Sequence, residues 1–200
     1  MTLLERPISE SYREPSTVVL ETKRLALRAP RLKDAKTVAM LANDRRIAEN
    51  TARIPHPYKI ADAEGFVALA NTVGGETVFL ITLHNRTVIG ACGLTMIDGQ
   101  PPELGYWLGV NYWGKGYATE AVHAVIDYAF TDLEHDALQA GARVTNPGSR
   151  RVLEKCGFQW TGVGLYRIRA LASSAPIDRF RLDRGIWHSL KSWSSARRLS

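Results

Sequence analysis

The sequence predicts an α+β protein in which a central sheet carries helices on its faces. Two observations predict this fold class. Strand-like runs follow one another as hairpins as well as alternating with helices, which is not the strict order of a parallel α/β fold. In addition, 200 residues with 45% hydrophobic and 23% charged residues match one ordinary globular domain.

The first part of the chain predicts one strand and two helices. Apolar and basic residues alternate over Lys23–Ala29, which is typical of a half-buried strand. Helical spacing of apolar residues, with Asp34 near the start, predicts a helix over Lys33–Ala42. A proline-broken loop, Asn50–Tyr58, then leads to a second helix at Ala61–Asn71.

The middle of the chain predicts a hairpin, a third strand and a long helix. Thr77–Leu83 and Thr87–Thr95 are β-rich and are separated by three residues, which is a hairpin signal. A third strand at Glu103–Val110 leads directly into "NYWGKGYATEA". Apolar residues then recur at helical spacing from Ala118 to Phe130.

The last part predicts a weaker strand, a short helix and two long strand-like segments. They are Leu138–Thr145, Ser149–Lys155 (stopped by Gly157), Phe158–Ala170 and Pro176–Trp187. The polar residues 1–16 are expected to form a flexible arm, residues 17–190 a single domain, and residues 191–200 a basic tail.

Composition limits the cellular setting. Two cysteines, no apolar run of membrane-spanning length and no signal-peptide pattern predict a cytoplasmic protein without a disulfide framework. The net charge of +6 suits a nucleic-acid binder or an enzyme for a polyanionic cofactor.

The stretch Gly114-Lys115-Gly116 lies between a strand and a helix. Unpaired N–H groups at a helix start, together with the helix dipole, make an anion site, and glycines let a phosphate approach the main chain. The alternative is an ordinary glycine turn with a solvated lysine. The stretch is not a P-loop, since Gly116 follows the lysine, and it lacks the third glycine of a dinucleotide fingerprint at Thr119.

From Trp113, the segment W-G-K-G-Y-A resembles the phosphate-binding signature of the GNAT acetyltransferase superfamily. "ELGYWLGVNYWGKGYATEA" and "TNPGSRRVLEKCGF" together resemble the branch of bacterial ribosomal-protein N-terminal acetyltransferases, as do "TKRLALRAPRLKDA" and "PHPY". The resemblance implies a mixed, mostly antiparallel sheet with a bulged, splayed strand pair and helices on both faces. Gly105 and Gly109 fit a strand of that kind.

The resemblance also implies acetyl-CoA as the co-substrate and no metal. The expected coenzyme-binding residues are Trp107, Leu108, Gly114, Lys115, Gly116, Tyr117, Ala118, Thr119, Asn146 and Ser149. From sequence alone, "NPGS" is a turn that Asn146 starts and in which Ser149 caps the next helix. The resemblance places Asn146 on the pantetheine arm and makes Ser149 the group that stabilises or protonates the departing thiolate.

Glu103 is the proposed catalytic base, and a surface carboxylate is the alternative. A strand N–H near Leu108 is the proposed oxyanion donor. The candidate acceptor-binding residues are Asn50, His56, Tyr58 and Tyr166, and His56 is also an alternative base. Cysteine catalysis and a metal site are not expected from the sequence spacing.

The predicted function is direct transfer of acetyl from acetyl-CoA to a primary amine, preferably a protein or peptide N-terminal α-amine. A small amine or amino acid is the alternative acceptor. A non-catalytic acetyl-CoA-binding module and a nucleic-acid-binding module are rival classes, although no nucleic-acid motif is found. No membrane partner is expected. A homodimer is possible, with Trp187 and Trp193 either at an interface or packed on their own domain.

Overall fold

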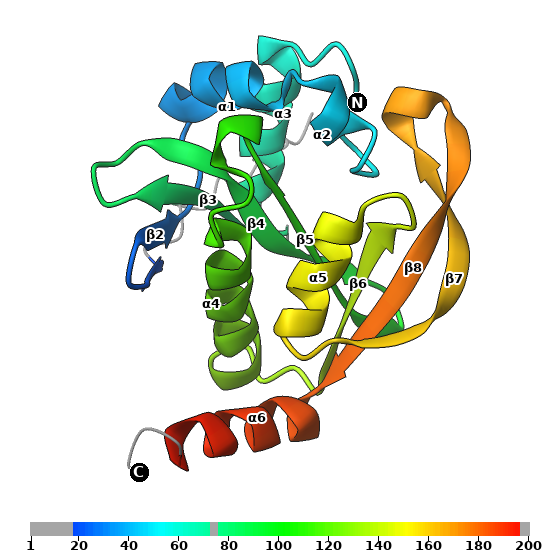
Figure 1. Cartoon of the computed structure of the whole chain (residues 1–200). Coiled ribbons are helices and arrows are strands. Elements are labelled where there is room, and N and C mark those ends of the chain that lie inside the picture. Colours follow the sequence, from blue (N-terminus) through cyan, green and yellow to red (C-terminus); the bar gives the residue numbers. More distant parts are fainter. Residues whose placement is uncertain (1–17, 73–75, 197–200) are drawn as a thin grey trace, which may run out of the picture.

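The computed structural model describes residues 18–72 and 76–196, and Figure 1 shows one sheet with helices around it. The predicted arm, residues 1–16, lies outside the described residues. The strands are β1 (Val19–Glu21), β2 (Leu25–Arg28), β3 (Thr77–Leu83), β4 (Val88–Ile97), β5 (Gln100–Leu108), β6 (Ala137–Arg143), β7 (Gln159–Ile168) and β8 (Ser173–Asp183). The α-helices are α1 (Ala35–Ala42), α2 (Arg45–Ala48), α3 (Ile60–Ala70), α4 (Tyr117–Thr131), α5 (Pro147–Lys155) and α6 (Arg184–Ala196).

The eight strands form one sheet in the order β1-β2-β3-β4-β5-β6-β8-β7. Every neighbouring pair is antiparallel except β5 and β6, which are parallel. The predicted hairpin of β3 and β4 is confirmed. The mixed, mostly antiparallel sheet that the sequence resemblance implied is therefore present.

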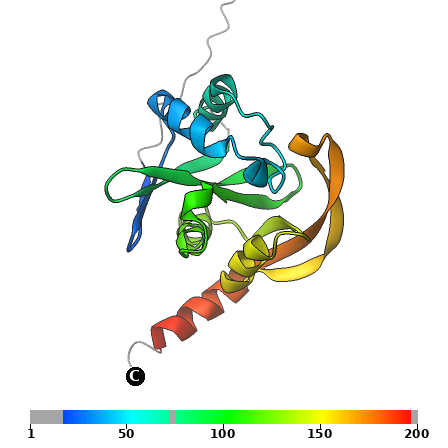
Figure 2. The same ribbon diagram turned by 45° about the horizontal axis from the view of Figure 1, so that its top comes forward.

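Helices cover both faces of the sheet, and each face has its own apolar core. In Figure 2, α1 and α3 lie on one side of the sheet and α4 on the other. The larger core packs α4 against inward residues such as Phe79 and Leu104, all at most 2% exposed. The smaller core packs α1 and α3 against Leu80 and Ala91. Alternation along each strand assigns neighbouring residues to opposite cores.

The strand pair β5 and β6 separates soon after it forms. The two strands pair only at Glu103↔Gln139 and Leu104↔Ala140, although β5 continues to Leu108 and β6 to Arg143. Against β4, the β5 register is regular from Glu103 to Leu108 and shifts only near Pro101–Pro102. The predicted splay is thus present, and the register irregularity lies at the beginning of β5.

The predicted strand Pro176–Trp187 and the predicted tail, residues 191–200, are both partly helical in the structure. The segment Pro176–Trp187 was expected to be all strand, but β8 ends at Asp183 and α6 begins at Arg184 and extends into the predicted basic tail. A strand would place Ile186 and Trp187 on opposite faces, whereas the helix brings both against the larger core. Trp187 packs on Phe130 of its own domain and donates to Asp127 Oδ1 at 2.9 Å.

The short elements β1 and α2 carry too few residues to show a periodic pattern, and the sequence did not predict them. Among the described residues, no helix combines the length and apolar character needed to cross a bilayer.

Candidate functional site

The glycine loop between β5 and α4 has a backbone shape that glycine favours. Gly114 and Gly116 have φ angles of +73° and +78°, in the left-handed region that other residues rarely adopt. Gly116 is the N-cap residue of α4. The first-turn N–H groups of α4, beginning at Tyr117, have no carbonyl to bind within the helix and point out of its end. This end of the helix can therefore bind an anion through main-chain donors.

An ion pair from the first strands supports this loop. Arg24 donates from Nε to Glu120 Oε2 (2.6 Å) and from Nη1 to the carbonyl of Lys115 (2.9 Å). Thr22 donates to the other oxygen of Glu120 at 2.6 Å, and the Arg24 guanidinium lies 4.6 Å from the ring centre of Tyr117. The Lys115 ammonium group is exposed and donates to the carbonyl of Asn111. Sequence reasoning missed Arg24, which has no local pattern that links it to a loop 91 residues later.

The open edge of β5 offers main-chain groups to a bound chain. Gly109 N–H donates to the carbonyl of Ile89 (2.9 Å), which continues the β4–β5 register. Because hydrogen-bonding directions alternate along an antiparallel strand, Tyr106 and Leu108 turn their N–H and C=O groups toward β6. β6 has separated there, and the carbonyl of Leu108 accepts a bond from Trp113 Nε1 at 2.8 Å. The remaining donors can pair with an extended ligand, as the prediction for Leu108 requires.

Asn146 and Ser149 lie together at the start of α5, on the far side of the splay. Asn146, not Ser149, is the helix cap, because its Oδ1 accepts the N–H of Ser149 at 3.1 Å. The expectation that Ser149 caps the helix is therefore wrong. Tyr106, which the sequence analysis missed, holds Ser149 in place. The Tyr106 hydroxyl donates to the carbonyl of Ser149 (3.1 Å) and lies 2.8 Å from Ser149 Oγ. Burial raises the pKa of Tyr106 well above its usual value, so it remains a neutral phenol.

Glu103 and Tyr166, predicted separately as base and acceptor contact, meet in the structure. The phenol of Tyr166 on β7 donates to Glu103 Oε2 on β5 at 2.8 Å. Burial, then the hydrogen bond to Glu103 and the charge of that carboxylate, raises the pKa of Tyr166 to about 12. Tyr166 therefore stays protonated at neutral pH and fixes the direction of the Glu103 carboxylate.

A cavity of about 650 Å³ lies beside this pair. Its lining includes most of the predicted catalytic and acceptor residues and two of the predicted coenzyme residues, Trp107 and Ser149. The lining residues among the predictions are Asn50, Tyr58, Glu103, Trp107, Ser149 and Tyr166. Gly93 and Gly105 lie opposite each other on β4 and β5, so this part of the cavity floor has no side chains. The volume is that of a small-molecule binding pocket.

The other predicted residues lie outside this cavity lining. Leu108 is buried in the larger core, and the glycine loop lies beyond the end of β5. His56 is exposed and is not among the lining residues. The Asn50 side chain donates to the carbonyl of Arg46 (2.8 Å), and its buried Oδ1 has no hydrogen-bond partner. Asn50 thus borders the cavity, but its side-chain oxygen is not accessible in this arrangement.

The loop Asn50–Tyr58 and the chain just after β7 touch each other. The N–H of Arg169, after β7, donates to the carbonyl of Ala52 in the loop at 3.0 Å. This bond joins the loop to the β7–β8 connection over the cavity. The structure thus brings the loop that carries Asn50, His56 and Tyr58 against the segment that follows Tyr166.

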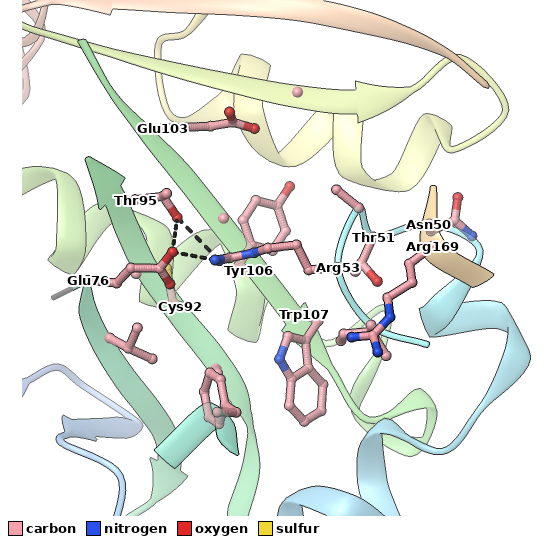
Figure 3. A pocket seen from close by; sticks show the side chains of 18 of the residues that line it. Asn50, Thr51, Arg53, Glu76, Cys92, Thr95, Glu103, Tyr106, Trp107 and Arg169 are labelled. Carbon is pink, nitrogen blue, oxygen red and sulfur yellow. Dashed lines mark hydrogen bonds and ion pairs between the residues drawn. The ribbon is translucent and has the colours of Figure 1, made fainter. Parts of the chain in front are cut away.

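A charged group in the cavity was not anticipated. Arg53 extends from the loop across the cavity to Glu76 and Thr95, as Figure 3 shows. Thr95 Oγ1 also donates to Glu76 Oε1 at 3.1 Å. These residues lie far apart in sequence and carry no pattern of their own, so only the fold identifies them as one group.

The structure does not favour cysteine or metal chemistry in the described part of the chain. Cys92 and Cys156 are both buried free thiols, and burial raises the pKa of each, that of Cys156 to about 12. A thiol with so high a pKa is a poor nucleophile at neutral pH. No group of three or more metal-ligating side chains occurs among the residues described.

Comparison with known proteins places this geometry in a family. The family model described as "Acetyltransferase (GNAT) domain" matches residues 24–159. An uncharacterized N-acetyltransferase of Bacillus licheniformis, p20, is 33% identical over 150 residues, which cover 72% of this chain and 84% of that protein.

Two solved structures share the fold at low sequence identity. A ribosomal-protein-S5-alanine acetyltransferase from Vibrio fischeri has a TM-score of 0.71 at 21% identity and covers 85% of this chain and 98% of its own. A spermidine N-acetyltransferase from Vibrio cholerae, in complex with CoA and spermine, has a TM-score of 0.71 at 22% identity and covers 83% and 99%. At these identities the likeness shows the fold, and it leaves the acceptor open.

Proposed function

This chain belongs to the GNAT acetyltransferase family, and from that premise we propose that it acetylates the N-terminal α-amine of a protein or peptide. The chain is an acetyl-CoA-dependent N-acetyltransferase, and the proposal concerns its acceptor and the roles of its residues. The observation that carries the proposal is the Glu103–Tyr166 pair, which puts a carboxylate in the cavity beside the open edge of β5.

The coenzyme half of the site supports a direct transfer. The main-chain donors of residues 114–119 would hold the phosphates, and the open edge of β5 would pair with the pantetheine arm. Asn146 uses its oxygen to cap α5, so its amide N–H₂ remains the group for the pantetheine arm. The left-handed glycines of the loop, the early separation of β5 from β6 and the cap made by Asn146 support these roles.

The reaction needs a neutral amine, a stabilised oxyanion and a leaving thiolate. Glu103 takes the proton of the bound ammonium group, and the amine then attacks the thioester carbonyl. The N–H of Leu108 faces the splay and donates to the oxyanion. As the C–S bond breaks, the hydroxyl of Ser149, held by Tyr106, gives its proton to the thiolate and takes up the second proton that the nitrogen loses in becoming the amide.

The acceptor proposal rests on the shape of the cavity and on a solved relative. The cavity is roofed by the Arg169–Ala52 bond, so it suits a small group or the end of a chain rather than its middle. A structure of the same fold bears the name of a ribosomal-protein alanine acetyltransferase. A small-molecule amine is the second candidate, because another bears the name of a spermidine acetyltransferase.

Two measurements test the proposal. First, acetyl-CoA at about 100 times its Kd should stabilise the fold by about 2.7 kcal/mol, whereas ATP, NAD and a short oligonucleotide should not. Second, thiol release should be fast with peptides that have a free N-terminus and absent with the same peptides N-acetylated. Release with small amines only would refute the peptide acceptor, and no shift with acetyl-CoA would refute the coenzyme site.

A further inference from the structure

A row of three polar side chains, Glu76, Thr95 and Glu103, lies on the cavity floor. It includes Glu76 as a second carboxylate besides Glu103. Thr95 stands opposite Glu103 across β4 and β5. The β3–β4 register, Thr77↔Leu94, places Glu76 opposite Thr95 when it is continued by one residue. All three side chains line the cavity. Since neighbouring strands are about 4.8 Å apart, the main chains of Glu76 and Glu103 lie about 10 Å apart on one face.

Glu76 already binds a cation in this structure. The Arg53 guanidinium forms an ion pair with Glu76 and donates to Thr95 Oγ1 at 3.2 Å. The two partners differ in exposure: the Glu76 side chain is 14% exposed and that of Arg53 is 64% exposed. A cation so exposed gains little from the pair and leaves at low cost, whereas the less exposed carboxylate needs a replacement.

We propose that Glu76 binds a second cationic group of the acceptor, which displaces Arg53, while the reacting amine lies at Glu103. This inference rests on the proposed function and specifies its acceptor: an amine with another ammonium or guanidinium group within about 10 Å. A peptide supplies that group from a basic side chain at its N-terminus, and a small molecule supplies it as a diamine. Arg53 is the stand-in for this group when no acceptor is bound.

The positions of other charged groups agree with this assignment. Arg169 lies on the opposite side of the cavity, next to Asn50 and Thr51, as Figure 3 shows. Arg143 donates to the carbonyl of Glu49 at 2.9 Å. Glu76 and Glu103 thus lie on the sheet side of the cavity, and Arg53 is the basic side chain that pairs with Glu76 there.

The experiment compares acceptors that differ by one charge. Diaminobutane is measured against pentylamine, and a Lys-Ala-Ala peptide against its norleucine counterpart. The dicationic member of each pair should have a kcat/KM about tenfold higher, as expected for one added charged hydrogen bond. The pair that shows the larger kcat/KM identifies the source of the second charge.

Two variants with opposite expected effects separate the roles of Glu76 and Arg53. Glu76→Gln keeps the size of the side chain and should abolish the preference for dications. Arg53→Gln removes the competing cation and should lower the KM for dications severalfold. Glu154→Gln and Arg45→Gln, in exposed ion pairs away from this row, are the matched controls and should keep the wild-type preference.

Binding of diaminobutane to the CoA-saturated enzyme is measured in parallel by calorimetry, and the acetyl-CoA thermal shift confirms that each variant is folded. Equal rates for monocations and dications, a preference that survives Glu76→Gln, or a higher KM in Arg53→Gln would each overturn the inference. In each of these cases the enzyme would still transfer acetyl groups, so the proposed function would stand. Loss of acetyl-CoA binding and of all turnover in the wild type would instead mark failure of the proposed function.

Discussion

Gly93 and Gly105 face each other across β4 and β5, and substitution by alanine should have opposite effects at the two positions. A Cβ atom at Gly105 would meet no atom within 4 Å, because it would project into the cavity. A Cβ atom at Gly93 would lie 2.4 Å from the carbonyl oxygen of Thr77. Neither glycine has a positive φ angle, so space alone decides the outcome.

The magnitudes follow from this geometry. Gly105→Ala removes the entropic cost of a glycine in a strand, which is about 0.5–1 kcal/mol. Its Tm should therefore rise by about 1–4 °C for a chain of this length. Gly93→Ala forces the neighbouring main chain to move, which should cost about 1–3 kcal/mol and lower the Tm. The same Gly105 methyl group takes space from the acceptor and should raise its KM about tenfold.

Thermal unfolding and initial-rate kinetics on the two variants check this prediction. Gly185→Ala is the control, because its Cβ also meets no atom within 4 Å and α6 lies away from the cavity. It should leave the acceptor KM unchanged. A lower Tm for Gly105→Ala would show that the space beside Gly105 is not free. A wild-type acceptor KM in that variant would show that the acceptor does not bind at the floor of the cavity.

Three further predictions concern single side chains. Glu103→Gln should lower kcat/KM by about 10²–10⁴-fold while acetyl-CoA affinity, measured by thermal shift, stays the same; full activity would assign the base elsewhere. Tyr106→Phe removes the bond that holds Ser149, so kcat should fall while the acceptor KM changes little, and an effect equal to that of Ser149→Ala would show that the two hydroxyls act as one unit. Burial raises the pKa of Asp34, but hydrogen bonds from Arg28 and Arg31 outweigh it and leave the pKa below its usual value. The ionised Asp34 therefore contributes its full stabilisation above about pH 4, and this stabilisation is lost as the pH falls further. Asp34→Asn should lower the free energy of unfolding by about 3 kcal/mol at neutral pH, as measured by urea titration. Below about pH 4, the stability of the variant should depend less on pH than that of the wild type.

Local patterns predicted the elements whose cause is local. The hairpin of β3 and β4 follows from two β-rich runs and a three-residue connection, and α4 follows from its spacing of apolar residues. The first residues of α6, 184–187, were predicted as strand because the packing partner of Trp187, Phe130, lies on α4. A tertiary contact determines the secondary structure of that segment, and the local sequence pattern carries no information about that contact.

The candidate site shows the same division. The glycines at 114 and 116 signal their own left-handed backbone. Asn146 and Ser149 are both good capping residues, so sequence alone could not assign the cap, which the structure gives to Asn146. Arg53 lies in a loop, Glu76 directly before β3 and Thr95 on β4, and only the fold brings them together.

The glycine loop takes its support from the other end of the domain. Thr22 and Arg24 reach Glu120 and the carbonyl of Lys115 across 91 to 98 positions of sequence. Bringing residues so far apart in sequence together costs conformational entropy, and the local hydrogen bonds of α4 do not compensate for it. If the loop binds the coenzyme as proposed, coenzyme affinity depends on the completed domain. A chain shortened to begin after β2 would keep every glycine of the loop. It would lose Thr22 and Arg24, which hold the loop through Glu120 and the carbonyl of Lys115, although its glycine motif would be unchanged.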